Sequence, residues 1–306
     1  MYIPKRCQHV RIPTPMGYLL DGLWFGGNRP KTAIAFVHGL GSNAFAHHEY
    51  LTPLASPSTA VLHFSNRGHD GIAGIKKLRP SSRRGYVYEQ AGMAHEIFTN
   101  SADDIQGVVN LLRRRGANRI YLVGHSTGCQ KIAYYLGRRG NRRHVTGAVL
   151  LCPISDYASA TYEDERRRKK AESAARKLVR QGKPSELLPA RAWRGPIDAQ
   201  RFLSLYTPDS EEEIFTYAQP RKIPHALRRV KSPALVVFAG DDEYRDRATE
   251  EIAGWFCKNL RSNRSEIQIV PGALHSFSGQ EAAVARIIRG WIARRNSVGP
   301  GLRDSV

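Results

Sequence analysis

A serine with one glycine two residues before it and another two residues after it stands in the segment GHSTG, residues 124–128. The apolar run IYLVG has the composition of a buried strand, and a helical pattern begins near Cys129. A chain that turns this sharply from strand to helix has room only for glycine at those two positions. The hydroxyl of Ser126 then lies at a helix N-terminus, where amides and the helix dipole favour developing negative charge. The pattern predicts a nucleophilic serine.

A serine hydroxyl is a poor nucleophile unless a base takes its proton and an acid orients that base. Candidates for both partners follow buried strands later in the chain. Asp241, Asp242 and Glu243 come directly after one strand, and His275 comes after the next. The chain order serine, acid, histidine is one that such sites use. We therefore predict a catalytic triad of Ser126, His275 and one of the three acids, among which spacing does not decide.

Acyl transfer also needs backbone N–H groups that bind the negative oxygen of the tetrahedral intermediate. The segment HGLG, residues 38–41, is a second glycine-rich loop, and it follows the strand-like run AIAFV. We expect the N–H groups of Leu40 and Thr127 to form this oxyanion hole. The alternative is that HGLG is a plain turn between two elements.

The sequence contains 11 histidines, and position selects His275 as the base because it alone follows the last predicted strand. His125 lies beside the predicted nucleophile, but we expect its ring to point elsewhere. Five more histidines lie in polar segments and are interpreted as surface residues. These are His47, His48, His95, His144 and His225.

The predicted strands are short, nearly continuous apolar runs, mostly rich in β-branched residues and ending in glycine or proline. They cover residues 33–39, 60–68, 119–126, 148–153, 234–240 and 266–272. Helical periodicity is clear over 103–115 and 282–292, and residues 18–25 could add an antiparallel strand. Strands that alternate with helices predict an α/β fold with a mostly parallel central sheet and helices on both faces.

One interval, residues 154–232, has no strand-like run and is too long for a strand-to-strand crossover. We expect an inserted, largely helical cap on a core of residues 1–153 and 233–306. A charged helix is predicted over 163–181, and the acidic stretch 209–213 is interpreted as a solvated loop. Apolar and aromatic cap residues are expected either to cover the pocket or to dock the cap on the core. They are Tyr157, Tyr162, Trp193, Phe202, Leu205, Tyr206 and Phe215.

Five motifs occur in an order that resembles the α/β-hydrolase superfamily: HGLG at 38–41, NRGHD at 66–70, GHSTG at 124–128, GDDEY at 240–244 and LHSF at 274–277. The resemblance spans essentially the whole chain and implies the α/β-hydrolase fold. It makes Asp242 the triad acid, with Asp241 as the alternative, and it implies no metal and no organic cofactor. NRGHD is expected to have a structural role, although His69 could line the pocket. A serine nucleophile disfavours dehalogenase and epoxide-hydrolase chemistry, which the superfamily performs with aspartate.

More narrowly, RFLSLYTPDSEEEIF in the cap, with GDDEY and NRGHD, resembles a poorly characterised group of α/β-hydrolases that includes fungal siderophore esterases. The basic cap helix differs in length from that group, so the substrate is not carried over. We expect a serine hydrolase that cleaves carboxylic esters of small to medium or aromatic acyl groups through an acyl-enzyme. Alternatives on the same triad are a siderophore-type esterase, an amide or peptide hydrolase and a C–C bond hydrolase.

The chain has 306 residues, with 47 Lys and Arg against 27 Asp and Glu, and hence a formal charge of +20. The basic clusters at 113–115, 138–143, 166–170 and 228–231 are separate and show no aromatic interleaving. Because arginines outnumber lysines 35 to 12, the excess indicates composition bias as much as selection for a partner. A nucleic-acid partner is disfavoured, and a non-catalytic ligand or nucleic-acid binder on the same fold is the alternative to an enzyme. The positive field is expected to attract a small anionic ester at low salt.

Four scattered cysteines show no metal or redox spacing and fit a reducing compartment. No stretch approaches the roughly 20 apolar residues that span a bilayer, and the N-terminus lacks a signal-peptide pattern. We therefore expect a soluble, cytoplasmic protein without a membrane partner, and the oligomeric state stays open.

Overall fold

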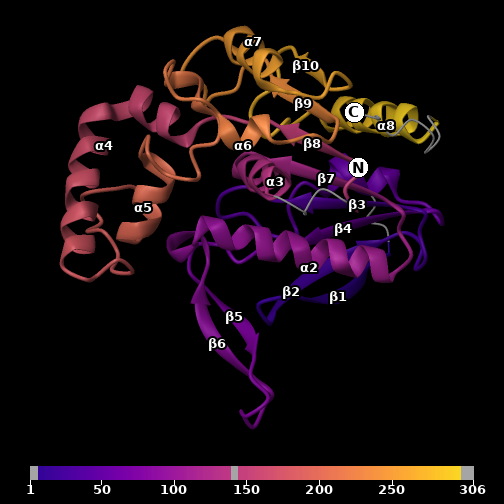
Figure 1. Ribbon diagram of the computed structural model, residues 1–306, viewed down its shortest axis with the longest axis horizontal. Coiled ribbons are helices and arrows are strands. Elements are labelled where there is room, and N and C mark those ends of the chain that lie inside the picture. The colour runs from indigo at the N-terminus through magenta and orange to yellow at the C-terminus, as the bar shows by residue number, and fades with distance from the viewer. Residues whose placement is uncertain (1–5, 139–143, 298–306) are drawn as a thin grey trace.

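The central strands are apolar along their whole length because helices cover both faces of the sheet. The computed structural model describes residues 6–138 and 144–297 (Figure 1). In β3 (Thr32–Val37) all six residues are buried. Ala33 and Val37 belong to the apolar cluster on one face, and Ile34 and Phe36 belong to the cluster on the other. Strand periodicity therefore divides the core into two layers.

In the described part of the chain, ten strands form one sheet in the order β10-β9-β8-β7-β3-β4-β2-β5-β6, with β1 paired to β2. The pairs from β10 to β4 are parallel, whereas β1, β5 and β6 join through antiparallel pairs around β2. The remaining strands are β1 (Gln8–Pro13), β2 (Tyr18–Phe25), β4 (Thr59–Phe64), β5 (Ala73–Leu78), β6 (Tyr86–Ala91), β7 (Arg119–His125), β8 (Gly147–Leu151), β9 (Ala234–Ala239) and β10 (Glu266–Val270).

Two sets of helices cover the sheet. On one face lie α2 (Ser101–Arg114), α3 (Thr127–Gly137), α6 (His225–Arg228) and α7 (Thr249–Asn259), which contribute Leu112, Ile132, Leu227 and Phe256 to the larger cluster. On the other face lie α1 (His48–Leu51) and α8 (Glu281–Ser297), which contribute Leu51 and Trp291. The carboxyl ends of the parallel strands therefore meet at one edge, where the loops that follow them can assemble a site.

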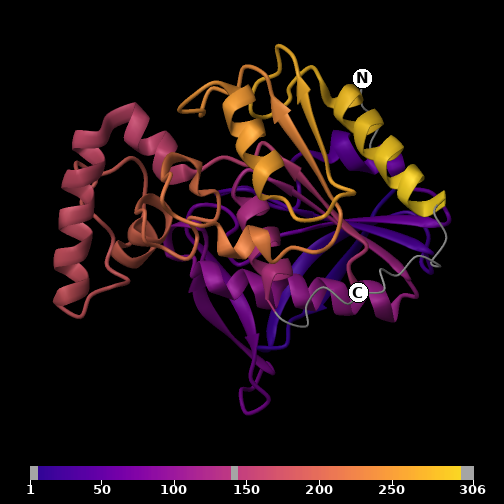
Figure 2. The same cartoon turned by 45° about the horizontal axis from the view of Figure 1, so that its top comes forward.

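The six apolar runs and the two periodic segments of the sequence all form the predicted strands and helices, so the α/β fold is confirmed. Residues 18–25 form β2, which is antiparallel to β4. Sequence patterns did not indicate β1 or the β5–β6 hairpin. In β5, Ile75 is the one buried residue of six, so this strand has no apolar run. Both views show the hairpin projecting away from the body of the molecule (Figures 1 and 2).

Helices α4 (Asp156–Arg180) and α5 (Ala199–Tyr206) lie together at one end of the molecule, opposite α8, in both views (Figures 1 and 2). They share an apolar cluster of their own, which includes Ala171 and Phe202. Helix α4 is kinked at Asp164, whose backbone is non-helical with φ −160° and ψ 83°, so it consists of two helical stretches. Ser155 caps the first stretch by accepting a hydrogen bond from the N–H of Ala158 at 3.0 Å. Asp164 accepts the N–H of Arg167 at 2.9 Å at the start of the second stretch, which matches the charged helix predicted over 163–181. Farther along this interval, Phe215 packs into the larger core cluster. The division into core and cap stays a prediction.

The basic clusters lie on different elements. Residues 113–115 lie at the end of α2, 166–170 lie within α4, and 228–231 begin at the last residue of α6. Of the cluster at 138–143, all but Arg138 falls outside the described residues. Among the described helices, none combines the length and the apolar character needed to cross a bilayer.

Candidate active site

The turn after β7 holds Ser126 in a backbone conformation that residues other than glycine rarely adopt, with φ 54° and ψ −128°. Its N–H donates to the carbonyl of Leu151 at 3.0 Å, which ties the turn to β8. A Cβ on Gly128 would lie 2.0 Å from the carbonyl oxygen of Val37, and one on Gly124 would lie 2.7 Å from the backbone of Gly128. The tight packing of β7, α3 and β3 therefore requires both glycines and fixes Ser126 at the start of α3.

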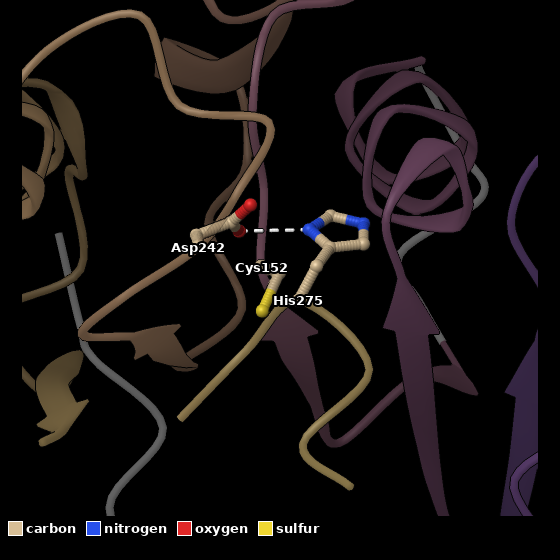
Figure 3. A group of neighbouring side chains, drawn as sticks. All are labelled: Cys152, Asp242 and His275. Carbon is tan, nitrogen blue, oxygen red and sulfur yellow. Dashed lines mark hydrogen bonds and ion pairs between the residues drawn. The ribbon is translucent and has the colours of Figure 1, made fainter. Parts of the chain in front are cut away.

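His275 and Asp242 are joined by a hydrogen bond of 2.7 Å between Nδ1 and Oδ2 (Figure 3). The other oxygen of Asp242 accepts the N–H of Tyr244 at 3.0 Å. Both residues are buried, with 4% of Asp242 and 7% of His275 exposed. A carboxylate on Nδ1 keeps the proton there and leaves Nε2 as the basic nitrogen.

The geometry distinguishes the three acids that spacing left open. The side chain of Asp241 is 64% exposed and pairs with Arg245 instead of with the histidine. Glu243 accepts the backbone N–H of His275 at 2.8 Å, so it holds the loop rather than the ring. Asp242 is therefore the acid of this group that contacts the imidazole.

Ser126 and His275 line the same cavity, which has a volume of about 370 Å³. Within the described residues, no hydrogen bond joins the Ser126 hydroxyl to His275. Hydrogen bonds of this kind are often loose in the absence of substrate and tighten when it binds. The structure thus joins His275 to Asp242 directly and sets Ser126 on the wall of the cavity that His275 lines.

The loop after β3 is fixed by a buried neutral histidine. The N–H of Asn66 donates to Nε2 of His38 at 3.0 Å, so Nδ1 carries the proton and donates it to the carbonyl of Gly39 at 2.8 Å. Burial, and next the charge of Lys131, lower the pKa of His38 to about 3. The histidine therefore keeps this tautomer at neutral pH.

That hydrogen bond also sets the direction of the next N–H group. In a trans peptide the carbonyl and the N–H point in opposite directions, so the N–H of Leu40 faces away from His38. A Cβ on Gly39 would lie 2.9 Å from Cβ of Ser126, which shows how closely the loop approaches the serine. Over residues 6–138 and 144–297, neither the N–H of Leu40 nor that of Thr127 has an acceptor. The first donor lies in the loop that approaches Ser126, and the second lies at the start of α3.

Several histidines lie deeper than their polar segments indicated. His125 donates from Nε2 to the carbonyl of His275 at 2.8 Å, so its ring points toward the loop that carries His275. This corrects the expectation that the ring of His125 points away from the site. His47 lines the cavity and stacks on Tyr50, and burial lowers its pKa. The surface assignment of His47 is therefore wrong. No signal in the sequence separates these residues from exposed histidines.

Of the other histidines, His95 is also misassigned. Its side chain is 7% exposed and bonds Asp198 at 2.9 Å. His48 is half-buried, whereas His144 and His225 are exposed as expected. His69 pairs with Asp70 at 2.8 Å and is not among the residues that line the cavity.

Cys152 lies behind the Asp242–His275 pair, and one ligand atom from each of the three residues falls within 4.8 Å of the others (Figure 3). Burial, and next the charge of Asp242, raise the pKa of the Cys152 thiol well above its usual value. A thiol must lose its proton to bind a metal. Asp242 also accepts the hydrogen bond from Nδ1 of His275. The three residues therefore fit a hydrogen-bonded pair with a thiol packed against it better than a metal centre.

The acidic stretch at 209–213 is solvated only in part, because Asp209 and Glu211 are exposed whereas the last two residues are buried. Glu212 and Glu213 are 2% and 6% exposed. Glu212 pairs with Arg201 of α5, and Arg201 also bonds Glu96 at 2.9 Å. Glu96 in turn pairs with Lys131 of α3 at 2.6 Å. This buried chain of ion pairs connects α5 to the helix that begins at Ser126, and sequence patterns do not reveal it because its members are far apart.

Of the seven cap residues singled out in the sequence, Trp193 and Tyr206 line the cavity. Phe202 packs inside the cluster of α4 and α5, Phe215 packs in the core, and Tyr162 is 74% exposed. The charged residues of the lining, apart from histidines, are Asp156, Glu163 and Arg194. The cavity that Ser126 and His275 line therefore also has polar and aromatic lining residues.

Over residues 90–292 the chain matches the model of a family described as a protein of unknown function, DUF1749. No curated protein matches the sequence. The solved structure of the siderophore hydrolase EstB from Aspergillus fumigatus is similar, with 18% identity, a TM-score of 0.64, and coverage of 96% of this chain and 99% of that chain.

Two further structures have the same architecture. A soluble variant of monoglyceride lipase from Saccharomyces cerevisiae has 12% identity, a TM-score of 0.63, and coverage of 96% of this chain and 99% of that chain. Carboxylesterase CesB from Bacillus subtilis has 15% identity, a TM-score of 0.57, and coverage of 95% and 93%. At these identities the likeness is one of fold, and the fold is that of the α/β-hydrolases.

Proposed function

The chain belongs to the DUF1749 family of proteins of unknown function, and we propose that it is a serine hydrolase that cleaves carboxylic esters through an acyl-enzyme. One observation carries the proposal. The 2.7 Å hydrogen bond between His275 and Asp242 lies beside the cavity that Ser126 lines from a strained turn. Backbone strain of this kind is retained where the surrounding structure holds it, often at functional sites.

In the proposed reaction, Oγ of Ser126 attacks the ester carbonyl carbon while Nε2 of His275 takes the hydroxyl proton. The carbonyl electron pair moves to oxygen and forms the tetrahedral intermediate. When that electron pair re-forms the carbonyl, the bond to the leaving alcohol breaks, and His275 gives the proton to that alcohol. Water then attacks the acyl-enzyme, with His275 again as base, and the acid is released while Ser126 regains its proton. Asp242 orients the ring and stabilises the imidazolium.

The N–H groups of Leu40 and Thr127 are proposed to bind the oxyanion. Support comes from their lack of acceptors in the described chain and from the direction that the His38–Gly39 bond gives to the first of them. Donors held in place before the reaction need no reorganisation when charge develops, and one such donor contributes about 10²–10³ in rate. No cofactor is required by these steps.

The substrate proposed is a small-molecule ester with a small to medium or aromatic acyl group. A cavity of about 370 Å³ lies at the small end of the range for ligand sites. In this proposal the cap at 154–232 selects the substrate, since Trp193 and Tyr206 come from it. A siderophore-type ester, an amide or a C–C bond are alternatives for the same triad. Whether the +20 charge favours anionic esters remains a prediction.

A fluorophosphonate probe followed by mass mapping tests the proposal. Wild-type protein should be labelled on Ser126, and Ser126→Ala should lose the label. Ser278→Ala is the control, because this exposed serine lies close to His275 in the chain. The control should be labelled as strongly as the wild type. Labelling that persists undiminished in Ser126→Ala rules out the assignment.

A further inference from the structure

The charge of the cavity is unbalanced at one residue. Glu163 and Arg194 are exposed and pair with each other, so they offset one another at the rim. Asp156, the first residue of α4, accepts a hydrogen bond from Nε2 of Gln130 at 2.9 Å. Among the residues that the structure describes, no lysine or arginine forms an ion pair with Asp156. The cavity therefore holds one acid without a cationic partner.

The buried ion pairs behind the cavity do not supply the missing cation. Lys131 and Arg201 are offset by Glu96 and Glu212, so that chain of four groups is neutral. Glu213 is held by the hydroxyl of Ser155 at 2.8 Å rather than by a cation. Asp156 thus adds a carboxyl group to a region where the existing positive charges are already paired.

Burial of an unpaired carboxyl favours its protonated form. Burial, and next the charge of Glu212, raise the pKa of Asp156 to about 8, and Arg201 offsets this only in part. Burial likewise raises the pKa of Glu213 to about 7. At neutral pH the carboxyl group of Asp156 therefore carries a proton. When a substrate cation binds beside this group, the proton would leave to solvent.

Two aromatic rings stand beside this acid. Trp193 and Tyr206 both line the cavity with Asp156, and their ring centroids are 4.7 Å apart. Burial, and next the charge of Asp156, raise the pKa of Tyr206. Aromatic faces attract ammonium groups, and quaternary ammonium ions most characteristically. A carboxylate and two rings in one cavity have the chemistry of a cation receptor.

We propose that Asp156, with the rings of Trp193 and Tyr206, binds an ammonium group of the substrate and makes cationic esters the preferred class. This inference rests on the proposed esterase function and deepens it. The +20 charge predicts a preference for anionic esters, whereas this inference predicts a preference for cationic esters. The cavity lining decides between them, because it contacts the substrate and the distant surface arginines do not. Asp156 acts as a specificity-determining residue.

The kinetic test uses esters of equal shape and different charge. In the acyl series, p-nitrophenyl esters of 4-(trimethylammonio)butyrate, 5,5-dimethylhexanoate and glutarate are cationic, neutral and anionic. In the alcohol series, butyrylcholine is compared with 3,3-dimethylbutyl butyrate. The readout is the ratio of kcat/KM for the cationic and the neutral ester, so a general change in activity cancels.

At least one series should favour the cation by about tenfold or more, as expected for a desolvated quaternary ammonium ion against aromatic rings. Asp156→Asn should reduce that ratio to about one, whereas the exposed cap variant Asp209→Asn should keep it. In the wild type the ratio should rise as pH increases through about 8 and Asp156 ionises, with Glu212, Glu213 and Arg201 facing it. A ratio near one in both series, a preference for the glutarate ester, or an unchanged ratio in Asp156→Asn overturns the inference.

A binding measurement separates this inference from the proposed function. In Ser126→Ala protein, calorimetry should show tighter binding of butyrylcholine than of 3,3-dimethylbutyl butyrate, and the difference should vanish when Asp156→Asn is added. If that result holds but no ester is hydrolysed and no probe labels Ser126, the cation site stands and the esterase proposal fails. Equal binding of the two esters contradicts the cation site whatever the catalytic result.

Discussion

The carboxylate of Asp242 lies 2.7 Å from Nδ1 of His275, while the backbone N–H of the same histidine donates to Glu243 at 2.8 Å. Adjacent acids thus hold the ring and the main chain of one residue. The third acid of the group, Asp241, faces solvent. Asp241 and Asp242 are therefore a matched pair for mutagenesis, because they are adjacent and only Asp242 contacts the imidazole.

Asp242→Asn should lower kcat by on the order of 10³–10⁴, because an amide cannot hold the imidazole in the tautomer that leaves Nε2 basic. Asp241→Asn, the same chemical change one residue earlier, should keep kcat within about twofold. Steady-state kinetics with a p-nitrophenyl ester measure both values. Equal losses in the two variants would exclude Asp242 as the orienting acid.

His38→Gln should make stability less dependent on pH. The pKa of His38 is about 3 in the folded protein and 6.5 in an unfolded chain. As pH falls from about 6.5 toward 3, the unfolded chain binds a proton that the folded protein does not, so the free energy of unfolding decreases. The slope from this group is at most about 1.4 kcal/mol per pH unit.

Urea unfolding at about pH 7.5 and about pH 5 measures that slope. It should be smaller in His38→Gln than in the wild type. The exposed control His225→Gln should retain the wild-type slope. An unchanged slope in His38→Gln would mean that His38 does not remain neutral as the structure requires.

Gly128→Ala should destabilise the protein severely, because the added methyl group would lie 2.0 Å from the carbonyl oxygen of Val37. Either α3 or β3 must move, and the proposed oxyanion donors lie at the start of α3 and in the loop that follows β3. Gly254→Ala in α7 is the control, since a Cβ there meets nothing within 4 Å. The control should be neutral or stabilising by about 0.5–1 kcal/mol. Thermal unfolding and ester hydrolysis measure the two effects. A Gly128→Ala variant with the wild-type Tm and the wild-type rate of hydrolysis would contradict this packing.

Arg201→Met should cost about 3–5 kcal/mol, because it leaves Glu96 and Glu212 buried without their partner. Arg176→Met removes a pair with Glu172 in which the arginine side chain is 46% exposed. That control should cost less than about 1 kcal/mol. The free energies of unfolding in urea give both costs, and similar values would mean that the buried chain of ion pairs contributes little to stability.

Much of the fold could be predicted because a parallel sheet covered on both faces requires continuous apolar strands. The loops that end those strands meet at one edge, so strand ends alone indicated where Ser126, His275 and Asp242 belong. The β5–β6 hairpin was not predicted because few of its residues are buried and it lacks an apolar run. Its strands are defined by pairing, not by burial.

The finer features of the site could not be read from the sequence, since they depend on how loops fold back. Spacing alone did not separate Asp242 from Asp241; the resemblance to α/β-hydrolases favoured Asp242, and the conformation of one turn brings it to His275. His47 and Glu212 lie in polar segments, yet the first stacks on Tyr50 and the second pairs with Arg201. Each contact joins parts of the chain whose proximity appears only in three dimensions.

Trapping the acyl-enzyme tests the central claim most directly. Protein quenched in acid during turnover of p-nitrophenyl butyrate should carry one butyryl group, and peptide mapping should assign it to Ser126. Asp242→Asn should accumulate it more slowly, and Ser126→Ala should carry none. A butyryl group on another residue, or hydrolysis by Ser126→Ala at the wild-type rate, would contradict the proposed mechanism.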